Sequence, residues 1–350
     1  MKKVILIISL FFPFIVKGIS TSATSAILMD TDNNRIIYSK NVHDVRSVAS
    51  ISKIMTAVLA VESGKMDDDV KINSSINKAY GSAIYIKLGE KMKLRDLVYG
   101  LMLRSGNDAA LAIADYVGGS VDNFVSMMNH KAKEIGMKDS RFNNPSGLDE
   151  DKGNYSTAYD MAILTSYAMK IKDYREIVKT KKYQLETNKN TYIWNNKHKL
   201  LRLYKYTTGG KTGYTKLAKR TLVTTASKDN TNFVVVTLND GNDFKDHMDL
   251  FDYGFENYKS YTILKKGNIS IYDDKYYKDY ILYIKKDCKY LLDDNEKKLV
   301  NIKYKLKKLK HIKSREIVGE VVVSVGDDNI YSEPIYVKEK RKNKKKWHIW

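Results

Sequence analysis

Cysteine and proline are nearly absent from this chain of 350 residues, which has one cysteine, Cys288, and three prolines. A single cysteine excludes an internal disulfide, so packed cores must stabilise the fold. The chain also lacks an apolar run of the roughly 20 residues that a membrane-spanning helix needs. Its longest such run, residues 4–16, is shorter than that. The length of the chain is sufficient for two domains.

The apolar run at the amino terminus has the pattern of an export signal. Lys2-Lys3 precede it, and small residues follow it over 18–26. A charged, then apolar, then small-residue order is typical of a secretory signal peptide. We therefore expect an exported, extracytoplasmic protein whose signal peptide covers about residues 1–20, with cleavage after Ser20 or Ala23.

Histidines are also few, and no familiar hydrolase motif accompanies them. The sequence has no Gly-x-Ser-x-Gly elbow and no His-x-x-x-His spacing. We expect neither a metal nor a cofactor. The six histidines are His43, His130, His198, His247, His311 and His348.

The chain does contain three short polar motifs in a fixed order: Ser50-Ile51-Ser52-Lys53, Ser105-Gly106-Asn107 and Lys211-Thr212-Gly213. Ser50 and Lys53 are three residues apart, so on a helix the hydroxyl and the amine share one face. A serine hydroxyl is a weak nucleophile, and a lysine can take its proton only if burial and neighbouring cations lower the amine pKa. Lys211 is a candidate for such a cation. Together the motifs offer a nucleophile, a base and an anchor for an anionic substrate.

Each motif alone is a weak indication of a catalytic site, and the sequence around each motif strengthens it. The serine–asparagine motif falls between two helical stretches, 94–103 and 108–117, which is typical of a loop beside a pocket. The Lys211 motif precedes strand-like segments at 220–227 and 232–238, which places it near a sheet edge.

Hydrophobic periodicity predicts an α/β fold. Strands at both ends of the first 260 residues enclose a helical insert, which indicates a mixed sheet covered by helices, with a cleft at the junction. Beyond residue 261, alternating patterns predict a small all-β domain, which we interpret as a spacer or docking domain. The expected segments are two strands within 25–40, a largely helical region over 50–167 with turns at Gly118-Gly119 and Pro145-Ser146-Gly147, strands over 206–239, and a closing helix over 243–258.

The motifs and their neighbours resemble a known family. Their arrangement is similar to that of penicillin-binding proteins and serine β-lactamases. Over residues 24–260 the chain resembles the low-molecular-mass D-alanyl-D-alanine carboxypeptidases, in VASISKIMTA around Ser50, LMLRSGNDAA around Ser105, FNNPSGLDE from Phe142 and GGKTGYT around Lys211. The resemblance implies a β-lactamase/transpeptidase-like antiparallel sheet with a helical subdomain. The β-rich region would be residues 261–337 and the tail residues 338–350.

The same resemblance implies roles for individual residues. Ser50 would be the acylated nucleophile, Lys53 its base, and Ser105 a proton donor to the departing D-alanine. The substrate amide would be held by Asn107. Substrate binding would also involve Lys211 and Thr212, which would take the terminal carboxylate, Gly213, and Tyr214, whose backbone N–H would form an oxyanion hole with that of Ser50.

The resemblance also implies a substrate and inhibitors. The substrate would be the peptidoglycan stem peptide ending in D-Ala-D-Ala, and β-lactam antibiotics would be covalent inhibitors. The net charge of +20 does not indicate nucleic acid, because no aromatic-basic motif accompanies it. The basic tail 338–350 ends on Trp347-His348-Ile349-Trp350, and we expect it to contact the outer membrane leaflet or an anionic wall polymer.

One departure from the family pattern and two alternatives stand beside this interpretation. Lys219 occupies a position where the family usually has glycine, so a Cβ and a charge enter a place where backbones can pack closely.

A serine β-lactamase is the competing enzyme. Class A lactamases use a glutamate between the second and third motifs, and Glu150 lies in that region, although its spacing does not single it out. The other alternative is a penicillin-sensing or wall-binding module without turnover.

Overall fold

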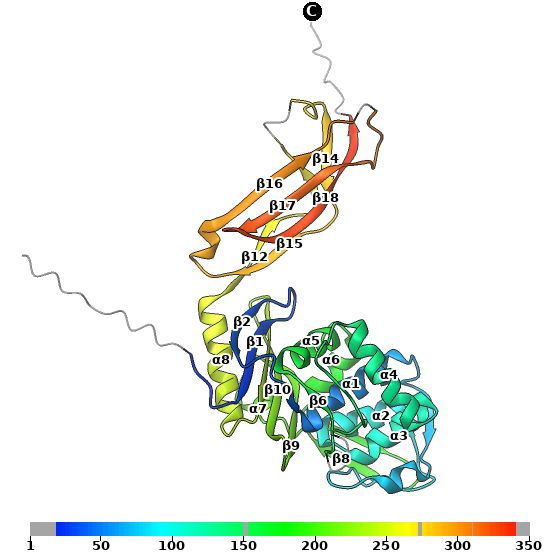
Figure 1. Cartoon of the computed structure of the whole chain (residues 1–350). Helices are drawn as coiled ribbons and strands as arrows, with labels where there is room; N and C mark the ends of the chain where they lie inside the picture. The colour runs from blue at the N-terminus through cyan, green and yellow to red at the C-terminus, as the bar shows by residue number, and fades with distance from the viewer. Residues whose placement is uncertain (1–18, 150–152, 272–274, 310, 341–350) are drawn as a thin grey trace, which may run out of the picture.

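The computed structural model describes residues 19–149, 153–271, 275–309 and 311–340 (Figure 1). Most of the expected signal peptide, Glu150 and the last ten residues of the expected tail lie outside these ranges. Within them, none of the helices combines the length and the apolar character that a membrane span requires.

A five-stranded antiparallel sheet forms the frame of the first domain, in the order β2-β1-β11-β10-β9. Its amino-terminal strand pairs with a strand from the far end of the domain, Ser25 opposite Leu238. Asp229 and Asn230, both with positive φ, make the tight turn between the two central strands. β9 is an edge strand, as predicted for the Lys211 motif. The strands are β1 Ser25–Asp30, β2 Ile36–Lys40, β9 Thr207–Thr215, β10 Lys219–Lys228 and β11 Thr231–Leu238.

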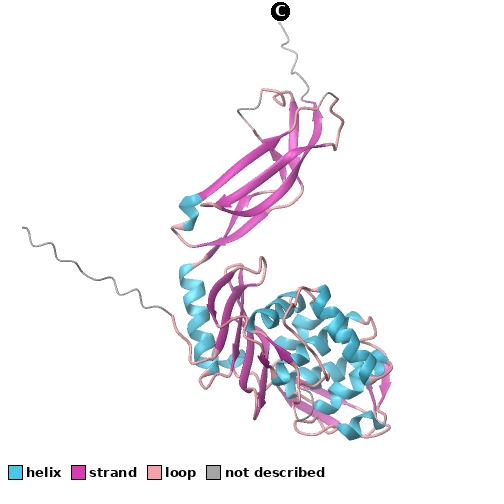
Figure 2. Cartoon of the chain, viewed as in Figure 1, coloured by secondary structure: helices cyan, strands magenta, loops and turns pink. Residues whose placement is uncertain are grey.

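Alternating residues of the sheet supply two separate cores, because successive side chains of a strand point to opposite faces. Phe233 and Val235 pack with helix α8, Asp243–Asn257, on one face. Val234 and Val236 belong to the large core on the other face, which the helical subdomain covers (Figure 2).

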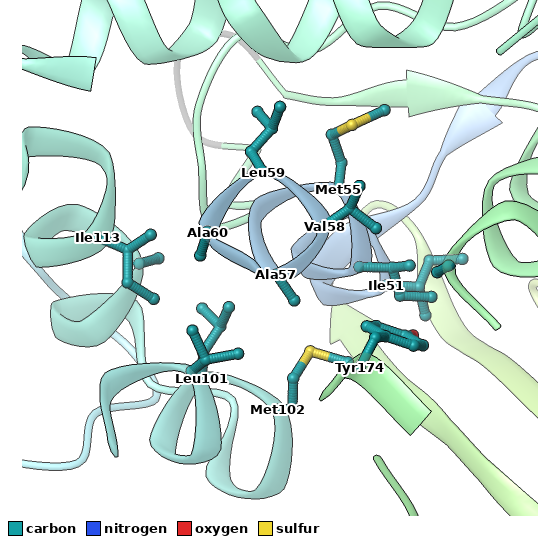
Figure 3. Packing of buried hydrophobic residues seen from close by; sticks show 14 of the residues in the cluster. Ile51, Met55, Ala57, Val58, Leu59, Ala60, Leu101, Met102, Ile113 and Tyr174 are labelled. Carbon is teal, nitrogen blue, oxygen red and sulfur yellow. The ribbon is translucent and has the colours of Figure 1, made fainter. Parts of the chain in front are cut away.

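The helical subdomain is built around α1. From Lys53 to Ala60 every residue of α1 is buried, and its apolar side chains pack against Leu101, Met102, Ile113 and Tyr174 (Figure 3). A helix that is apolar on all sides must be surrounded by protein. The helices are α1 Lys53–Glu62, α2 Leu94–Tyr99, α3 Asn107–Gly118, α4 Val121–Glu134, α5 Ala158–Ala168 and α6 Lys172–Lys179.

The predicted helical region over 50–167 is correct for α1 to α5 and for the turn at Gly118-Gly119, and it is wrong for two stretches. Helix α6 lies beyond the predicted region. Residues 64–93 contain a short hairpin, β4 Asp69–Lys71 with β5 Lys91–Lys93, and a 3-10 turn, Ser74–Lys78. Residues 136–149, 153 and 154 form loops. Glycines in left-handed conformation, among them Gly81, Gly89 and Gly147, interrupt both stretches, which explains why regular helices do not form there.

The second domain consists almost entirely of strands, as predicted. Its five-stranded sheet has the order β13-β14-β18-β17-β16, and a two-stranded sheet, β12 with β15, links it to the first domain. Leu282, Val321, Ile335 and Val337 lie in its core. The bounds are β12 Lys259–Leu264, β13 Gly267–Ile269, β14 Tyr280–Ile284, β15 Cys288–Leu292, β16 Val300–Leu306, β17 Ile317–Val325 and β18 Asp328–Lys340. The predicted fold, a helix-covered antiparallel sheet followed by a small all-β domain, is confirmed.

Arg35 joins the two domains. It lies in the connection between β1 and β2, and its guanidinium donates hydrogen bonds to the Leu291 carbonyl and to Glu296. The rings of Tyr258 and Tyr290 lie 5.4 and 5.2 Å from the guanidinium carbon. Ion pairing, backbone hydrogen bonding and cation–π contact therefore meet on one side chain at this junction.

Candidate active site

Ser50 and Lys53 meet at the start of α1. Ser50 lies in a 3-10 turn, Ala49–Ser52, that leads directly into the helix, and its Oγ is 2.8 Å from Lys53 Nζ. The preceding residue, Ala49, has φ +51, a strained conformation of the kind that concentrates at functional sites. The structure therefore brings the predicted hydroxyl and amine into direct contact.

Lys53 is fully buried and has two further partners, Asn107 Oδ1 at 2.7 Å and the Ser146 carbonyl. Burial, together with the nearby charges of Lys211 and Lys197, lowers the pKa of Lys53 well below its usual value. A neutral amine has two N–H donors and one lone pair. If the two N–H groups serve Asn107 and Ser146, the lone pair remains for the Ser50 hydroxyl proton.

The Ser146 carbonyl is presented by a tightly fitted loop. Gly147 has φ +82, and a Cβ there would lie 2.0 Å from the Ala49 carbonyl oxygen. Asn144 Oδ1 accepts hydrogen bonds from the backbone N–H groups of Ser146 and Gly147. From the sequence, only the family resemblance pointed to this loop. The acceptor is a backbone carbonyl, and the residue type at a position does not reveal such an acceptor.

The second motif places Asn107 against Lys53 and Ser105 against Lys211. Ser105 has φ +67 at the end of a short π-helical turn, and Asn107 begins α3. Asn107 is fixed by two hydrogen bonds, from its N–H to the Ser82 carbonyl at 2.7 Å and from its Nδ2 to the Tyr80 carbonyl. The next residue, Asp108, accepts hydrogen bonds from the backbone N–H groups of Ile84, Tyr85 and Ile86, a role that the sequence did not indicate.

The third motif lies on β9, directly beside Ser50. Lys211 Nζ donates to Ser105 Oγ at 3.0 Å and to the Thr212 carbonyl at 2.7 Å. Burial and the charge of Lys197 lower the pKa of Lys211 from 10.5 to about 7. A Cβ on Gly213 would lie 3.0 Å from the Ser50 nitrogen, so the absence of a side chain allows β9 to approach the nucleophile.

Residues of all three motifs line one cavity of about 350 Å³, together with cations that the sequence analysis missed. Ser50, Ser105, Thr212 and Gly213 form part of its wall, and Tyr214, which is 64% exposed, forms part of the rim. Lys197, Lys199 and Arg220 also line it. Lys53 and Lys211 are buried behind its wall, and Asn107 lines a different cavity, with Ser146. Burial and the charge of Arg104 lower the pKa of Lys197. Arg220 forms an ion pair with Asp243, which lines the same cavity, so Lys197 and Lys199 supply the net positive charge of the wall, and that charge suits an anionic substrate.

Two buried histidines support the sheet behind the cavity. Thr224 Oγ1 is hydrogen-bonded to both His198 Nε2, at 3.0 Å, and His247 Nδ1, at 2.8 Å. Burial lowers the pKa of His198 to about 4 and that of His247 well below its usual value, so both stay neutral near pH 7. Among the described residues no acidic, histidine or cysteine cluster could hold a metal ion. These histidines are therefore structural.

Lys219 begins β10 with φ +58, and its side chain is exposed. The exposed side chain carries its charge to the surface, and close packing around the Cβ at this position remains a prediction. A glycine is favoured here by the left-handed backbone, which costs a lysine about 1–2 kcal/mol.

The comparisons with known proteins agree with this geometry. A family model described as D-alanyl-D-alanine carboxypeptidase matches residues 14–242, and one described as penicillin-binding protein 5, C-terminal domain, matches 258–343. The chain is 34% identical over 254 residues to D-alanyl-D-alanine carboxypeptidase DacF of Bacillus subtilis, and 30% identical over 269 residues to DacC of Escherichia coli. The alignments cover 70% and 71% of this chain and 65% of each relative, so the chain spans just under two thirds of either.

Solved structures extend the likeness over both domains. Penicillin-binding protein 5 from Haemophilus influenzae aligns with a TM-score of 0.78 at 27% identity, over 92% of this chain and 98% of that one. Penicillin-binding protein 6B from Escherichia coli aligns with a TM-score of 0.72 at 26% identity, over 92% and 97% of the two chains.

Proposed function

This chain belongs to the D-alanyl-D-alanine carboxypeptidase family, and from that premise we propose that it is a serine D,D-carboxypeptidase acting on peptidoglycan stem peptides. It would remove the terminal D-alanine through an acyl-enzyme on Ser50. The observation that carries the proposal is the environment of Lys53 Nζ, a buried amine within 2.8 Å of Ser50 Oγ and held by two further acceptors.

Acylation requires one proton to leave the nucleophile and one to reach the leaving group. Lys53 takes the Ser50 proton as Oγ attacks the carbonyl carbon of the penultimate D-alanine. The developing oxyanion faces the backbone N–H groups of Ser50 and Tyr214. The departing D-alanine nitrogen receives a proton by way of Ser105, whose hydroxyl contacts Lys211. The peptide bond breaks and an ester on Ser50 forms.

The basic rim accounts for recognition of a free carboxyl terminus. Thr212 in the cavity wall and Lys211, whose Nζ contacts the wall residue Ser105, would hold the terminal carboxylate, and Lys197 adds a cation to the wall. Asn107, which contacts Lys53, would hold the substrate amide. Charge-assisted hydrogen bonds of this kind are the stronger ones in proteins, so the cavity favours a peptide with a free C-terminal carboxylate.

Hydrolysis of the acyl-enzyme separates this proposal from the β-lactamase alternative. Among the described residues, which leave out Glu150, the groups that contact Lys53 Nζ are a hydroxyl, a side-chain amide and a backbone carbonyl. The loop that supplies the carbonyl is the Asn144–Leu148 segment that resembles the carboxypeptidases. This resemblance of the loop favours the carboxypeptidase, in which water is the final acceptor of the acyl group.

The decisive experiment is release of D-alanine from a peptide ending in Lys-D-Ala-D-Ala. We expect D-alanine release together with slow turnover of a chromogenic cephalosporin. A fast colour change without D-alanine release would instead identify a β-lactamase. Penicillin capture without either reaction would support a sensing or wall-binding module.

The depressed pKa of Lys211 predicts a pH-dependent KM. Lys211 must be protonated to attract a carboxylate, and its pKa in the free site is about 7. As the pH rises above that value the charge is lost, so KM for the free-acid peptide should rise by up to about tenfold per pH unit. At the acid end, the rate should fall as Lys53 becomes protonated.

The measurement is KM and kcat between pH 5 and 9, with a C-terminally amidated peptide as the matched control. The amide has no carboxylate, so its KM should not rise in parallel. A KM for the free acid that stays flat from pH 6 to 9 would contradict the role of Lys211.

The remaining features concern placement in the cell. We propose that the protein is exported, that residues 24–260 form the catalytic domain, and that the β-rich domain, 261–337, acts as a spacer. The basic tail, 338–350, would contact the membrane or an anionic wall polymer. The support is the order of charged and apolar residues at the two ends of the sequence.

A further inference from the structure

A second cavity, of about 400 Å³, lies far from the nucleophile, between the carboxyl-terminal end of α5, helix α6 and the near ends of the central strands. Thr208 lines it near the beginning of β9, whereas Gly213, near the end of the same strand, lines the catalytic cavity. A strand rises about 3.3 Å per residue, so roughly 17 Å separates the two positions. The proposed carboxypeptidase reaction uses no residue of this second cavity.

The cavity contains a buried hydroxyl without a partner. Ser166, on α5, is 2% exposed and lines the cavity. Within the part of the chain that the structure describes, its Oγ has no hydrogen-bond partner. Most buried polar groups in proteins are satisfied, and an exception inside a cavity indicates a group that a ligand can satisfy.

Three basic side chains, Lys170, Arg175 and Lys179, and two acidic ones, Asp32 and Glu176, line the same cavity. Arg175 Nη1 donates to the Met169 carbonyl at 2.7 Å, which leaves most of its five N–H donors available. Of the two acidic residues in the wall, Glu176 is paired with Lys179 at 2.7 Å and Asp32 accepts a hydrogen bond from Asn232 at 3.2 Å. Among the described residues, neither Arg175 nor Lys170 forms an ion pair with a cavity carboxylate.

The rest of the wall combines hydroxyls with an apolar surface. Thr31, Thr208 and Ser227 place hydroxyl groups in the wall, and those of Thr31 and Thr208 donate within the protein, to the Asn232 carbonyl and to Thr225 Oγ1. Phe233 and Ala226 provide apolar contact. Ligand sites typically have a mostly apolar lining with a few polar groups that fix orientation. The planar guanidinium of arginine matches carboxylate and phosphate oxygens in particular.

We propose that this cavity binds a small ligand that carries an oxyanion, either carboxylate or phosphate, on a hydroxylated body. Arg175 holds the oxyanion, Lys170 adds charge at the mouth, and the Ser166 hydroxyl bonds to a polar group of the ligand inside. The site is independent of the chemistry at Ser50.

Methionine methyl NMR tests the proposal on the full-length protein, because Met169 lines the cavity. The protein carries 13C-methyl methionine, and Met169→Leu assigns the signal. Glycerol 3-phosphate serves as the phosphate probe, N-acetylmuramic acid as the carboxylate probe, and N-acetylglucosamine as the neutral control. Met127, which lines a different cavity, is the internal reference.

We expect a saturable shift of the Met169 methyl with at least one acidic probe, and none with the neutral sugar. Arg175→Gln should weaken that affinity by about tenfold or more, and Ser166→Ala should weaken it by several-fold. Lys172→Gln, an exposed change on the same helix, should leave it unchanged. A response to phosphate alone or to carboxylate alone identifies the ligand class.

Two results would overturn the site: no saturable shift with either acidic probe, or equal affinity in the wild-type, Arg175→Gln and Ser166→Ala proteins. If Arg175→Gln does not fold, Arg175→Lys keeps the charge and removes the planar fork, and it should still weaken binding. An affinity that Arg175→Lys and Ser166→Ala both leave intact would again exclude the proposal.

Discussion

Ser50→Ala is expected to abolish both covalent labelling by penicillin and release of D-alanine. No other group replaces the lost nucleophile, because the neighbouring hydroxyl of Ser52 is buried and donates to the Ala49 carbonyl at 2.7 Å. The change removes one oxygen from a half-buried side chain, so the thermal unfolding midpoint should remain close to that of the wild type. Gel fluorescence after incubation with a fluorescent penicillin measures the labelling.

Ser126→Ala is the matched control for this result. Ser126 lies on α4, and its hydroxyl donates to the Asp122 carbonyl at 3.1 Å within the same helix. This variant should label and turn over like the wild type. Labelling that persists in the Ser50→Ala protein would refute the assignment of the nucleophile, whatever the activity of the control.

Lys53→Ala and Lys53→Arg should each slow acylation by about a hundredfold to ten-thousandfold, the usual contribution of a general base. The alanine variant removes the amine. The arginine variant places a permanent positive charge at this position and cannot accept a proton near neutral pH, because a guanidinium stays protonated. Similar losses in the two variants would therefore show that the site needs the basicity of the amine and not a charge. The second-order rate constant for acylation, measured at several pH values, is the readout.

Far-ultraviolet circular dichroism and thermal unfolding control for folding in this pair, because Lys53 is fully buried. Lys65→Ala, just beyond the end of α1 in an exposed position, should acylate at the wild-type rate. Wild-type acylation by Lys53→Arg would show that the residue supplies charge alone, and the proposed proton transfer would then be wrong.

The three motifs could be found from the sequence because the chemistry fixes their residue types and the helix fixes their spacing. A three-residue separation along one helical turn was enough to predict that the side chains of Ser50 and Lys53 meet. The edge position of Lys211 followed from the two strand-like segments that come after it. Their convergence on one cavity depends on tertiary packing, and the sequence indicated it only through the order of the motifs.

Other parts of the site left no such signal. The Ser146 carbonyl belongs to the backbone, and Asp108 acts by fixing the loop at Ile84–Ile86. Lys197 was one lysine among many in a chain with 61 lysines and arginines. The short hairpin over 69–93 was missed because each of its strands has only three residues. Periodicity is not informative over so short a span.

The close fit of Gly213 against the Ser50 nitrogen limits how this protein can evolve. A side chain at that position would narrow the entrance for a bulky antibiotic, and it would also displace the backbone that carries the nucleophile. In the proposed carboxypeptidase, the same substitution would disturb the reaction on the substrate as well. A β-lactam that occupies the space beside Gly213 would therefore contact a position where an added side chain is costly to the protein's own proposed reaction.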